Sequence, residues 1–442
     1  MSIIILTLLC LGVIMYTYIR LDKNVKKVSF AYGISVFILL LLSSLNLLGL
    51  YKVSNYTYFI IILSTISFLI SFSILSKKYI KENESKYDIN IFLDKFLKSK
   101  IVHAIVIINL ILVVFYKIKY NIVIQDLSQQ EIRLARFDKL FDNAFETLFF
   151  NYIITGIIYL LSNLLAILIV NKRIKNILFF LITANIIIYS LIGYGRMVYF
   201  NIAIYVFINI LLKNDLKKFL NIKTAIKTLS VFIIIFVIFT GLLFARSESN
   251  KLTTTENLQR TLKSQCEQVI EYSVGGFRLL DNFIKKGFDE FTTYTFGRAT
   301  FAGLEEILLY PIKATGIEIS SFNNIISKYT QKEILIGENN SYFNAYYTCI
   351  MNFYLDFGII GVIVFPIMHS ILIIYCLKNY YKQKNIYSLL LLNYVLLNLF
   401  FSIIRWNYQS GTSTFILLIL IFANILSNIY EKRKNENIMD SK

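Results

Sequence analysis

The sequence has little charge, little proline and almost no histidine. Charged residues make up 16% of its 442 residues, whereas a soluble domain carries about 25%. The two histidines, His103 and His369, lie far apart in the chain, which excludes a histidine-rich metal site. No P-loop motif occurs, which excludes nucleotide hydrolysis of that type, and no Asp-x-Asp motif occurs either. We therefore expect no metal and no cofactor.

Long apolar stretches dominate what is present. Hydrophobic residues account for 57% of the chain, and many stretches approach the ~20 residues that cross a bilayer. The sequence predicts an all-α polytopic membrane protein, with about 11 transmembrane helices in one integral-membrane domain over residues 1–442. The predicted spans are 3–19, 28–50, 58–76, 101–116, 147–170, 177–192, 197–212, 229–245, 350–377, 386–404 and 413–430.

Basic residues divide the loops into two sets. The net charge of +18 comes largely from Lys and Arg at the ends of spans, which is typical of membrane topology rather than of nucleic-acid binding. The first set contains 26 Lys and Arg and the short loops of the second set contain eight. The first set is 20–27, 77–100, 171–176, 213–228, 378–385 and 431–442, and the second is 51–57, 117–146, 193–196 and 405–412.

The positive-inside rule places the more basic set in the cytoplasm. We therefore expect the amino terminus outside, the carboxyl terminus in the cytoplasm, and residues 246–345 as one large external loop that caps the bundle. A large external loop favours chemistry or recognition at the outer face of the membrane.

Arg196 is the first candidate for binding an anion. Two apolar runs of about 16 residues flank Gly193-Tyr194-Gly195-Arg196. Each run rises ~24 Å as a helix, less than the ~30 Å hydrocarbon core, so we expect the turn slightly below the outer surface. An arginine there either binds a phosphate group through its planar fork or extends to lipid headgroups.

Four further arginines are candidates. Arg246 and Arg405 stand at predicted outer ends of spans, where each alone is typical of an interfacial anchor. If Arg246 and Arg405 lie at the same level as Arg196, however, the three arginines would form a site able to hold a pyrophosphate. Arg278 and Arg298 lie in the large loop beside glycines, which allow backbone and side chain to approach a ligand. The alternative is that Arg278 and Arg298 are ordinary charged residues on the solvated surface.

The segment 339–361 is rich in aromatic and amide side chains. Asn344 and Tyr347 are of the types that bind sugars by hydrogen bonding and ring stacking. A tyrosine-rich interfacial belt is the alternative. Asp356 precedes an apolar run, and the sequence leaves open whether it caps that helix or is a buried acid.

Three local features of the backbone are also predicted. The paired glycines Gly275-Gly276 are expected to break a helical pattern, and Pro366 to kink the span around it. The amphipathic stretch Leu304 to Leu309, after Phe296-Gly297-Arg298, predicts short helices lying on the bundle.

Taken in order, several of these motifs resemble the O-antigen polymerase (Wzy-type, oligosaccharide repeat unit polymerase) family. The resemblance covers roughly residues 150–378. It rests on the hairpin Gly193 to Arg196, the loop segment Tyr272 to Phe277, Asn344-Ala345-Tyr346-Tyr347, and the run Phe353 to Gly361 that contains Asp356-Phe357-Gly358.

The resemblance implies a glycosyltransferase of bacterial polysaccharide (O-antigen, lipopolysaccharide or capsule) biosynthesis. Such an enzyme moves a growing glycan from undecaprenyl pyrophosphate onto the next lipid-linked repeat unit, at the outer face of the inner (plasma) membrane. It implies metal-independent catalysis, with Arg196, and Arg278 or Arg298, as the catalytic arginines that hold the pyrophosphate. The partners implied are undecaprenyl-pyrophosphate-linked oligosaccharide, membrane lipid and a chain-length regulator, with no nucleic acid.

Two alternatives remain. The related O-antigen ligases carry a histidine in the loop where this chain has Asn344, Tyr347 and Thr348, which weakens a ligase-like assignment and leaves the general base unnamed. A flippase for lipid-linked oligosaccharide is typically built from two similar halves with short loops. The absence of an inverted repeat and the large external loop weigh against it.

Overall fold

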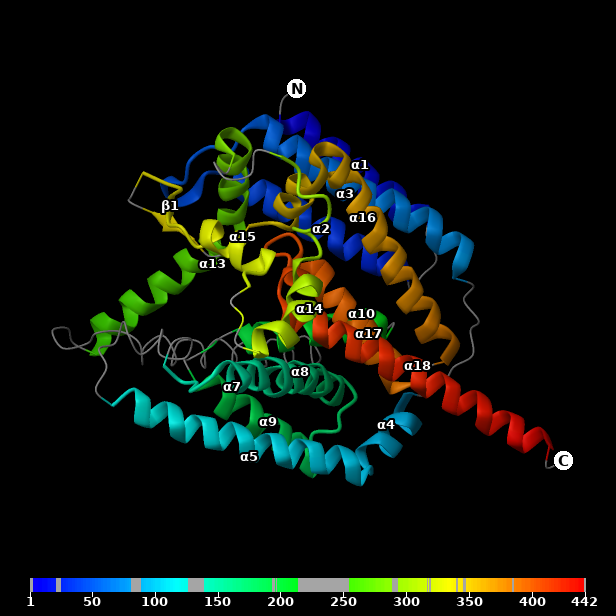
Figure 1. The fold of residues 1–442 in the computed structure, drawn as a ribbon. Coiled ribbons are helices and arrows are strands. Elements are labelled where there is room, and N and C mark those ends of the chain that lie inside the picture. The colour runs from blue at the N-terminus through cyan, green and yellow to red at the C-terminus, as the bar shows by residue number, and fades with distance from the viewer. Residues whose placement is uncertain are drawn as a thin grey trace. The chain divides into compact units, whose positions relative to one another are not determined.

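The computed structural model is mostly helical (Figure 1). It describes residues 3–20, 25–80, 89–125, 139–192, 195, 197–213, 254–287, 293–315, 317, 319–338, 341–344, 347–383 and 385–440. The elements over apolar segments are α1 (Ile3–Arg20), α2 (Val25–Ser44), α3 (Asn55–Tyr79), α5 (Lys100–Val123), α7 (Ala144–Leu148), the π-helix η2 (Phe149–Ile154), α8 (Thr155–Val170), α9 (Ile177–Ser190), α10 (Met197–Leu212), α16 (Cys349–Gln383), α17 (Ile386–Phe401) and α18 (Gly411–Asp440).

The remaining elements connect these helices. They are η1 (Leu47–Gly49), α4 (Ile89–Leu97), α13 (Thr254–Lys286), α14 (Ala302–Ala314), α15 (Phe322–Thr330), β1 (Ile334–Leu335), β2 (Tyr342–Phe343) and η3 (Asn407–Gln409).

The apolar helices mark a membrane-embedded protein. Within the described ranges, six helices are long and apolar enough to cross a membrane, and four apolar helices are shorter. Every predicted span except 229–245 overlaps one of these helices, and 229–245 lies outside the described residues. The helical character of the fold is therefore as the sequence predicts. The number of spans and the external position of 246–345 stay predictions.

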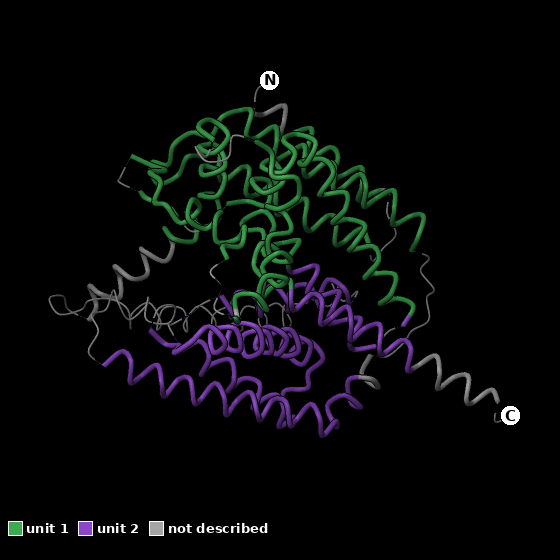
Figure 2. The backbone as a smooth tube through the Cα atoms, in the orientation of Figure 1, with its two compact units in different colours: residues 1–84, 266–382, 398–414 green, residues 85–265, 383–397, 415–442 purple. Residues whose placement is uncertain are grey.

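The chain forms two compact units, each built from segments that are far apart in the sequence (Figure 2). The predicted single membrane domain thus has two parts. Unit 1 comprises residues 1–84, 266–382 and 398–414, and unit 2 comprises 85–265, 383–397 and 415–442.

Buried amides link the helices of unit 2, where α8 packs against both α9 and α10. The Nδ2 of Asn393 donates to Asn163 Oδ1 at 2.9 Å and to Asn209 Oδ1 at 3.3 Å, and Asn163 Nδ2 donates to the carbonyl of Leu390 at 2.9 Å. Hydrogen-bonded amides of this kind hold helices together where apolar contacts alone provide little specificity.

In unit 1, α1, α2 and α3 pack together, and aromatic rings fill part of the space between them. Tyr32 and Phe68 meet edge to face with centroids 4.9 Å apart. Ser54 caps α3, because its Oγ accepts a hydrogen bond from the N–H of Thr57, as a serine at a helix start typically does.

The predicted break at Gly275-Gly276 is wrong, because α13 continues through both glycines. A Cβ at Gly275 would lie 3.0 Å from the ring of Phe343. The glycine therefore allows β2 to approach the helix rather than interrupting it. The strands β1 and β2 pair antiparallel, with Ile334 opposite Phe343, a small departure from an all-helical chain.

The break in α16 lies at Phe357 and Gly358, ahead of the predicted kink at Pro366. Gly358 has a φ of 59° and a ψ of −138°, a conformation that only glycine adopts readily. The helix resumes directly afterwards and runs through the proline, because the bilayer-spanning parts of membrane helices tolerate proline where neighbours supply contacts.

Candidate functional site

In unit 1, the loops predicted to lie outside the membrane contact one another. The Nε of Arg278 donates to the carbonyl of Tyr51 at 2.9 Å, which joins residues 246–345 to the 51–57 loop. The N–H of Gly411 donates to Glu306 Oε2 at 2.8 Å, which joins the same segment to the 405–412 loop. Three of the predicted outer segments therefore meet in unit 1.

The loops predicted to be cytoplasmic also contact one another. In unit 1, Lys378 Nζ lies over the ring of Tyr79, 5.6 Å from its centroid. In unit 2, Arg173 Nη2 is 2.8 Å from Asp94 Oδ2. Both contacts join segments of the more basic set, so the contacts inside each unit agree with the division that charge predicts.

Arg298 lies on a tight turn whose backbone is held by a buried carboxylate. Asp356, fully buried in α16, accepts hydrogen bonds at Oδ1 from Thr295 Oγ1 (2.5 Å) and from the N–H of Ala299 (3.0 Å), and at Oδ2 from the N–H of Thr300 (2.8 Å). Asp356 is therefore a buried acid that caps this turn, and not the cap of the helix that follows it.

Two other buried side chains hold the carbonyls of the same turn. Asn352 Nδ2 donates to the carbonyl of Ala299 at 2.9 Å, and Trp406 Nε1 donates to the carbonyl of Thr300 at 2.7 Å. We call residues 295–301, with these three supports, the Arg298 turn. Phe296 and Gly297, with φ of 51° and 93°, supply its left-handed backbone, which explains the glycine before the arginine.

The Arg298 side chain is 57% exposed. Its Nη2 is 2.9 Å from Glu305 Oε1, and its Nε is 3.2 Å from Glu305 Oε2. The guanidinium also lies over the ring of Phe322, 4.9 Å from its centroid. Hydrogen bonds to Glu305 raise the pKa of Arg298, so the side chain carries a permanent, oriented positive charge.

Glu306, on the next position of α14, ties that helix to its neighbours. In addition to Gly411, its carboxylate accepts a hydrogen bond from Asn323 Nδ2 of α15 at 3.0 Å, and Tyr310 Oη, one turn along α14 itself, donates to it at 3.0 Å. Glu305 likewise accepts from the N–H of Phe322 at 3.2 Å. These bonds fix α14, and with it the partner of Arg298, against α15 and the start of α18.

Arg278 contrasts with Arg298. It is buried, and each of the five N–H groups of its guanidinium can be matched to an acceptor in the protein. The acceptors are Tyr51 O, Ser43 Oγ, Ser43 O, Val274 O and Asn46 Oδ1, at 2.9–3.4 Å. In this geometry Arg278 holds the connection between α2 and α3, and its predicted catalytic role stays a prediction.

Asp281, one turn further along α13, reinforces the same connection. Its carboxylate accepts hydrogen bonds from Ser54 and Thr57 at the start of α3, and Lys285 Nζ is 2.6 Å from its Oδ2. Partial burial raises the pKa of Asp281, but the hydrogen bonds from Lys285, Ser54 and Thr57 outweigh it, so the pKa lies below its usual value.

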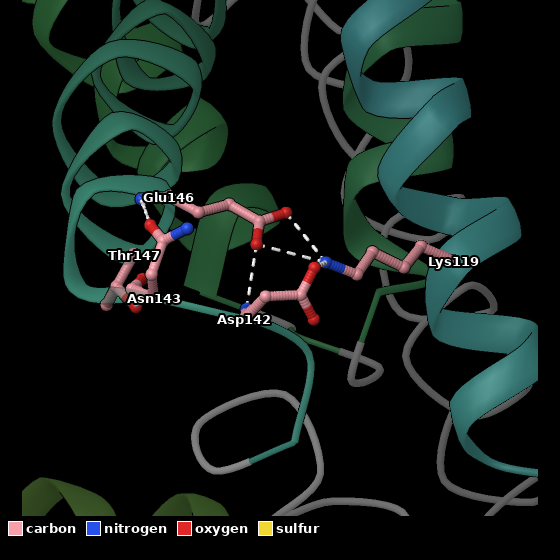
Figure 3. Close-up of polar contacts among 5 residues, drawn as sticks. All are labelled: Lys119, Asp142, Asn143, Glu146 and Thr147. Carbon is pink, nitrogen blue, oxygen red and sulfur yellow. Dashed lines mark hydrogen bonds and ion pairs between the residues drawn. The ribbon is translucent and has the colours of Figure 1, made fainter.

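Unit 2 has its own cluster of charges (Figure 3). Lys119 Nζ is 2.8 Å from Glu146 Oε1 and 2.9 Å from Asp142 Oδ2. Asn143 caps α7 through a bond from the N–H of Glu146 to its Oδ1. Nearby in the sequence, Lys117 Nζ donates to the carbonyl of Leu191 at 3.0 Å. The predicted outer segments 117–146 and 193–196 therefore begin at the same end of this unit.

The remaining predicted site residues lie outside the clusters described above or outside the described residues. Asn344 is exposed, Tyr347 is buried, and burial raises the pKa of the Tyr347 hydroxyl. Arg405 is half-buried beside Trp406 in sequence, and its N–H donates to the carbonyl of Phe401. Arg196 and Arg246 lie outside the described residues.

Sequence reasoning missed the supports of the Arg298 turn. Asn352 is one of many asparagines in the sequence, and Trp406 directly follows Arg405, whose position is typical of an interfacial anchor. Trp406 is nonetheless the single tryptophan of the chain, and a tryptophan buried in a protein normally donates its N–H to a specific acceptor. That signal was available in the sequence.

Among the described residues, no group of three or more His, Cys, Asp or Glu side chains is placed to hold a metal ion. Comparison of the chain with protein-family models, with curated proteins and with solved structures finds no match. A function must therefore be inferred from the chain's own residues.

Proposed function

We propose that this protein is a polymerase of lipid-linked oligosaccharide repeat units, acting at the outer face of a bacterial plasma membrane. The apolar helices and the resemblance of residues 150–378 to the O-antigen polymerases support the proposal. So does the grouping of loops within each unit, which agrees with the division predicted from charge.

The observation that carries the proposal is the Arg298 turn. Asp356, Asn352 and Trp406, which are themselves buried, hold the backbone of the turn. Glu305 orients the exposed guanidinium that the turn carries. A surface arginine needs no such support if it only keeps the protein soluble. Fixed donors with a permanent charge are what a phosphate-binding site requires, because they need no reorganisation when negative charge develops.

The proposed reaction releases a negatively charged pyrophosphate, which a fixed cation can stabilise. In the proposed reaction the bond between the anomeric carbon and the pyrophosphate oxygen breaks, and a bond from that carbon to an acceptor hydroxyl forms. The hydroxyl proton passes to the departing pyrophosphate or to a nearby carboxylate. Arg298 would bind the departing pyrophosphate through the N–H groups that it does not use on Glu305, while Glu305 keeps the guanidinium oriented.

The test is a surface-polysaccharide profile from cells that lack this protein, complemented with wild type, Arg298→Ala, Arg298→Lys or Lys332→Ala. We expect the deletion to leave single repeat units. Arg298→Ala should lower polymerisation about 10²-fold at unchanged protein level, and Arg298→Lys should restore part of it, because lysine lacks the planar fork.

Lys332→Ala is the matched control, because Lys332 is an exposed cation of the same loop that lies over the ring of Tyr329. It should polymerise normally. Long chains in the deletion strain would contradict the proposal. Accumulation of lipid-linked units on the cytoplasmic leaflet alone would instead identify a flippase.

A further inference from the structure

The helix α14 exposes a stripe of apolar side chains along one face. Leu304, Leu308 and Ile312 are spaced four residues apart, so they lie on one side of the helix. They are 39%, 67% and 39% exposed. Phe301, just before the helix, is also exposed. Apolar side chains that are exposed together on one face of a helix need an apolar surrounding to cover them.

The rest of α14 is fixed to the protein, so the stripe cannot turn inward. Glu305 accepts from the N–H of Phe322, and Glu306 accepts from Asn323 and from the N–H of Gly411. Rotation of the helix about its axis would break these hydrogen bonds and leave two half-buried carboxylates without them.

The start of the stripe contacts α16, which has exposed apolar side chains of its own. The ring of Phe301 lies 5.9 Å from that of Phe365, and Ile360 and Val364, on the same stretch of α16, are exposed. Since α16 is long and apolar enough to cross a membrane, its exposed side chains are the ones that contact lipid.

We infer that α14 is an interfacial helix whose apolar stripe is immersed in the lipid of one leaflet. Its 13 residues span only ~20 Å, too short to cross the bilayer. Arg298 before the helix and Lys313 in its last turn provide basic groups at both ends, which suit the anionic headgroups that border such helices.

This inference does not depend on the proposed polymerase activity, because it uses only the membrane-embedded character of the chain. It changes the expected role of this part of the 246–345 loop. Rather than capping the bundle in water, α14 would place the Arg298 turn at the level of lipid phosphates.

The test is nitroxide labelling of full-length Leu308→Cys and Ile312→Cys, each reconstituted in vesicles of phosphatidylethanolamine and phosphatidylglycerol. Labelled wild type serves as the blank for the four native cysteines. Asn344→Cys is the control, because Asn344 is exposed in the same loop. The measurement is collision of each label with oxygen, which concentrates in lipid, and with a nickel chelate, which stays in water.

We expect the ratio of oxygen to nickel collisions to be several-fold higher at 308 and 312 than at 344. A label at 308 that meets nickel as often as the label at 344 would show that the stripe faces water. A label at 308 that neither reagent reaches would show that protein covers it. Either result overturns the inference.

Discussion

Asp356 and Thr300 are joined by a hydrogen bond of 2.8 Å from the N–H of Thr300 to Oδ2, across 56 positions of the sequence. Asp356 lies beside the break in α16, and Thr300 belongs to the turn that carries Arg298. The carboxylate therefore connects the backbone of an apolar helix to the most exposed of the candidate arginines that the structure describes. The geometry of Arg298 depends on an acid that never contacts solvent.

Replacing this acid tests that dependence. Asp356→Asn keeps the size of the side chain, but its amide NH2 cannot accept a hydrogen bond, so a donor would face a backbone N–H of Ala299 or Thr300. We expect a loss of about 1–3 kcal/mol in the free energy of unfolding, together with loss of long chains in the polysaccharide profile. Thermal unfolding of the purified protein in detergent measures the first effect.

The control for that variant is Asp94→Asn. Asp94 pairs with Arg173 at 2.8 Å with both side chains partly exposed, and such pairs contribute only about 0.2–1 kcal/mol. If Asp356→Asn unfolds at the same temperature as Asp94→Asn and still makes long chains, Asp356 does not hold the Arg298 turn.

Arg196 is the subject of a second prediction, made from sequence alone. Arg196→Ala should abolish polymerisation while leaving protein levels intact, because the short apolar runs that flank Arg196 in the sequence are expected to hold its charge slightly below the outer surface. Arg196→Lys should restore activity only in part. The polysaccharide profile measures chain length, and an immunoblot measures the protein level. Full activity of Arg196→Ala would show that Arg196 is not part of the site.

The apolar helices could be predicted from sequence because hydropathy and length act locally. The Arg298 turn could not, because its supports come from two other segments, α16 and the 405–412 loop, and depend on tertiary contacts. Arg278 and Arg298 looked equivalent in the sequence, each within two residues of a glycine. They differ because the acceptors around Arg278 are backbone carbonyls and side chains of the α2–α3 connection, which no local pattern brings together with it.

The Gly275-Gly276 prediction failed for a related reason. Glycine and proline weaken a helix by amounts that packing can offset. The ring of Phe343 occupies the space beside Gly275, so the close approach compensates for the missing side chain. At Gly358 the positive φ accompanies the tie from Asp356 to the 295–301 turn. No rule based on sequence alone predicts that hydrogen bond.

A third prediction concerns acid pH. The folded-state pKa of Asp281 lies below its ordinary value of 3.8, so the ionised group stabilises the fold above that pH. The stabilisation is lost as the pH falls from about 3.8 through the lower folded-state pKa. We expect wild type to be more stable than Asp281→Asn at pH 6, with the difference shrinking below about pH 4.

Unfolding temperatures of both proteins across this pH range measure the effect, in one detergent and at one ionic strength. A difference that stays constant from pH 6 to pH 3 would mean that Asp281 acts through packing alone. A difference that grows toward low pH would contradict the sign of the pKa shift.

The last prediction uses the tightest contact of α14. A Cβ at Gly303 would lie 2.5 Å from the carbonyl oxygen of Tyr408 and 2.6 Å from that of Ser410, and backbone atoms cannot move aside as a flexible side chain can. Gly303→Ala should therefore push the start of α14 away from the 408–411 segment and weaken the bond from Gly411 to Glu306. We expect a cost of about 1–3 kcal/mol in the free energy of unfolding.

Gly12→Ala is the matched control, because a Cβ at Gly12 of α1 would meet nothing within 4 Å. Alanine is the better helix former by about 0.5–1 kcal/mol, so this variant should be as stable as wild type or more so. Thermal unfolding in detergent compares the two, and the polysaccharide profile reports whether the displaced helix carries Glu305 away from Arg298. If Gly303→Ala matches Gly12→Ala in both measurements, α14 does not depend on this close approach.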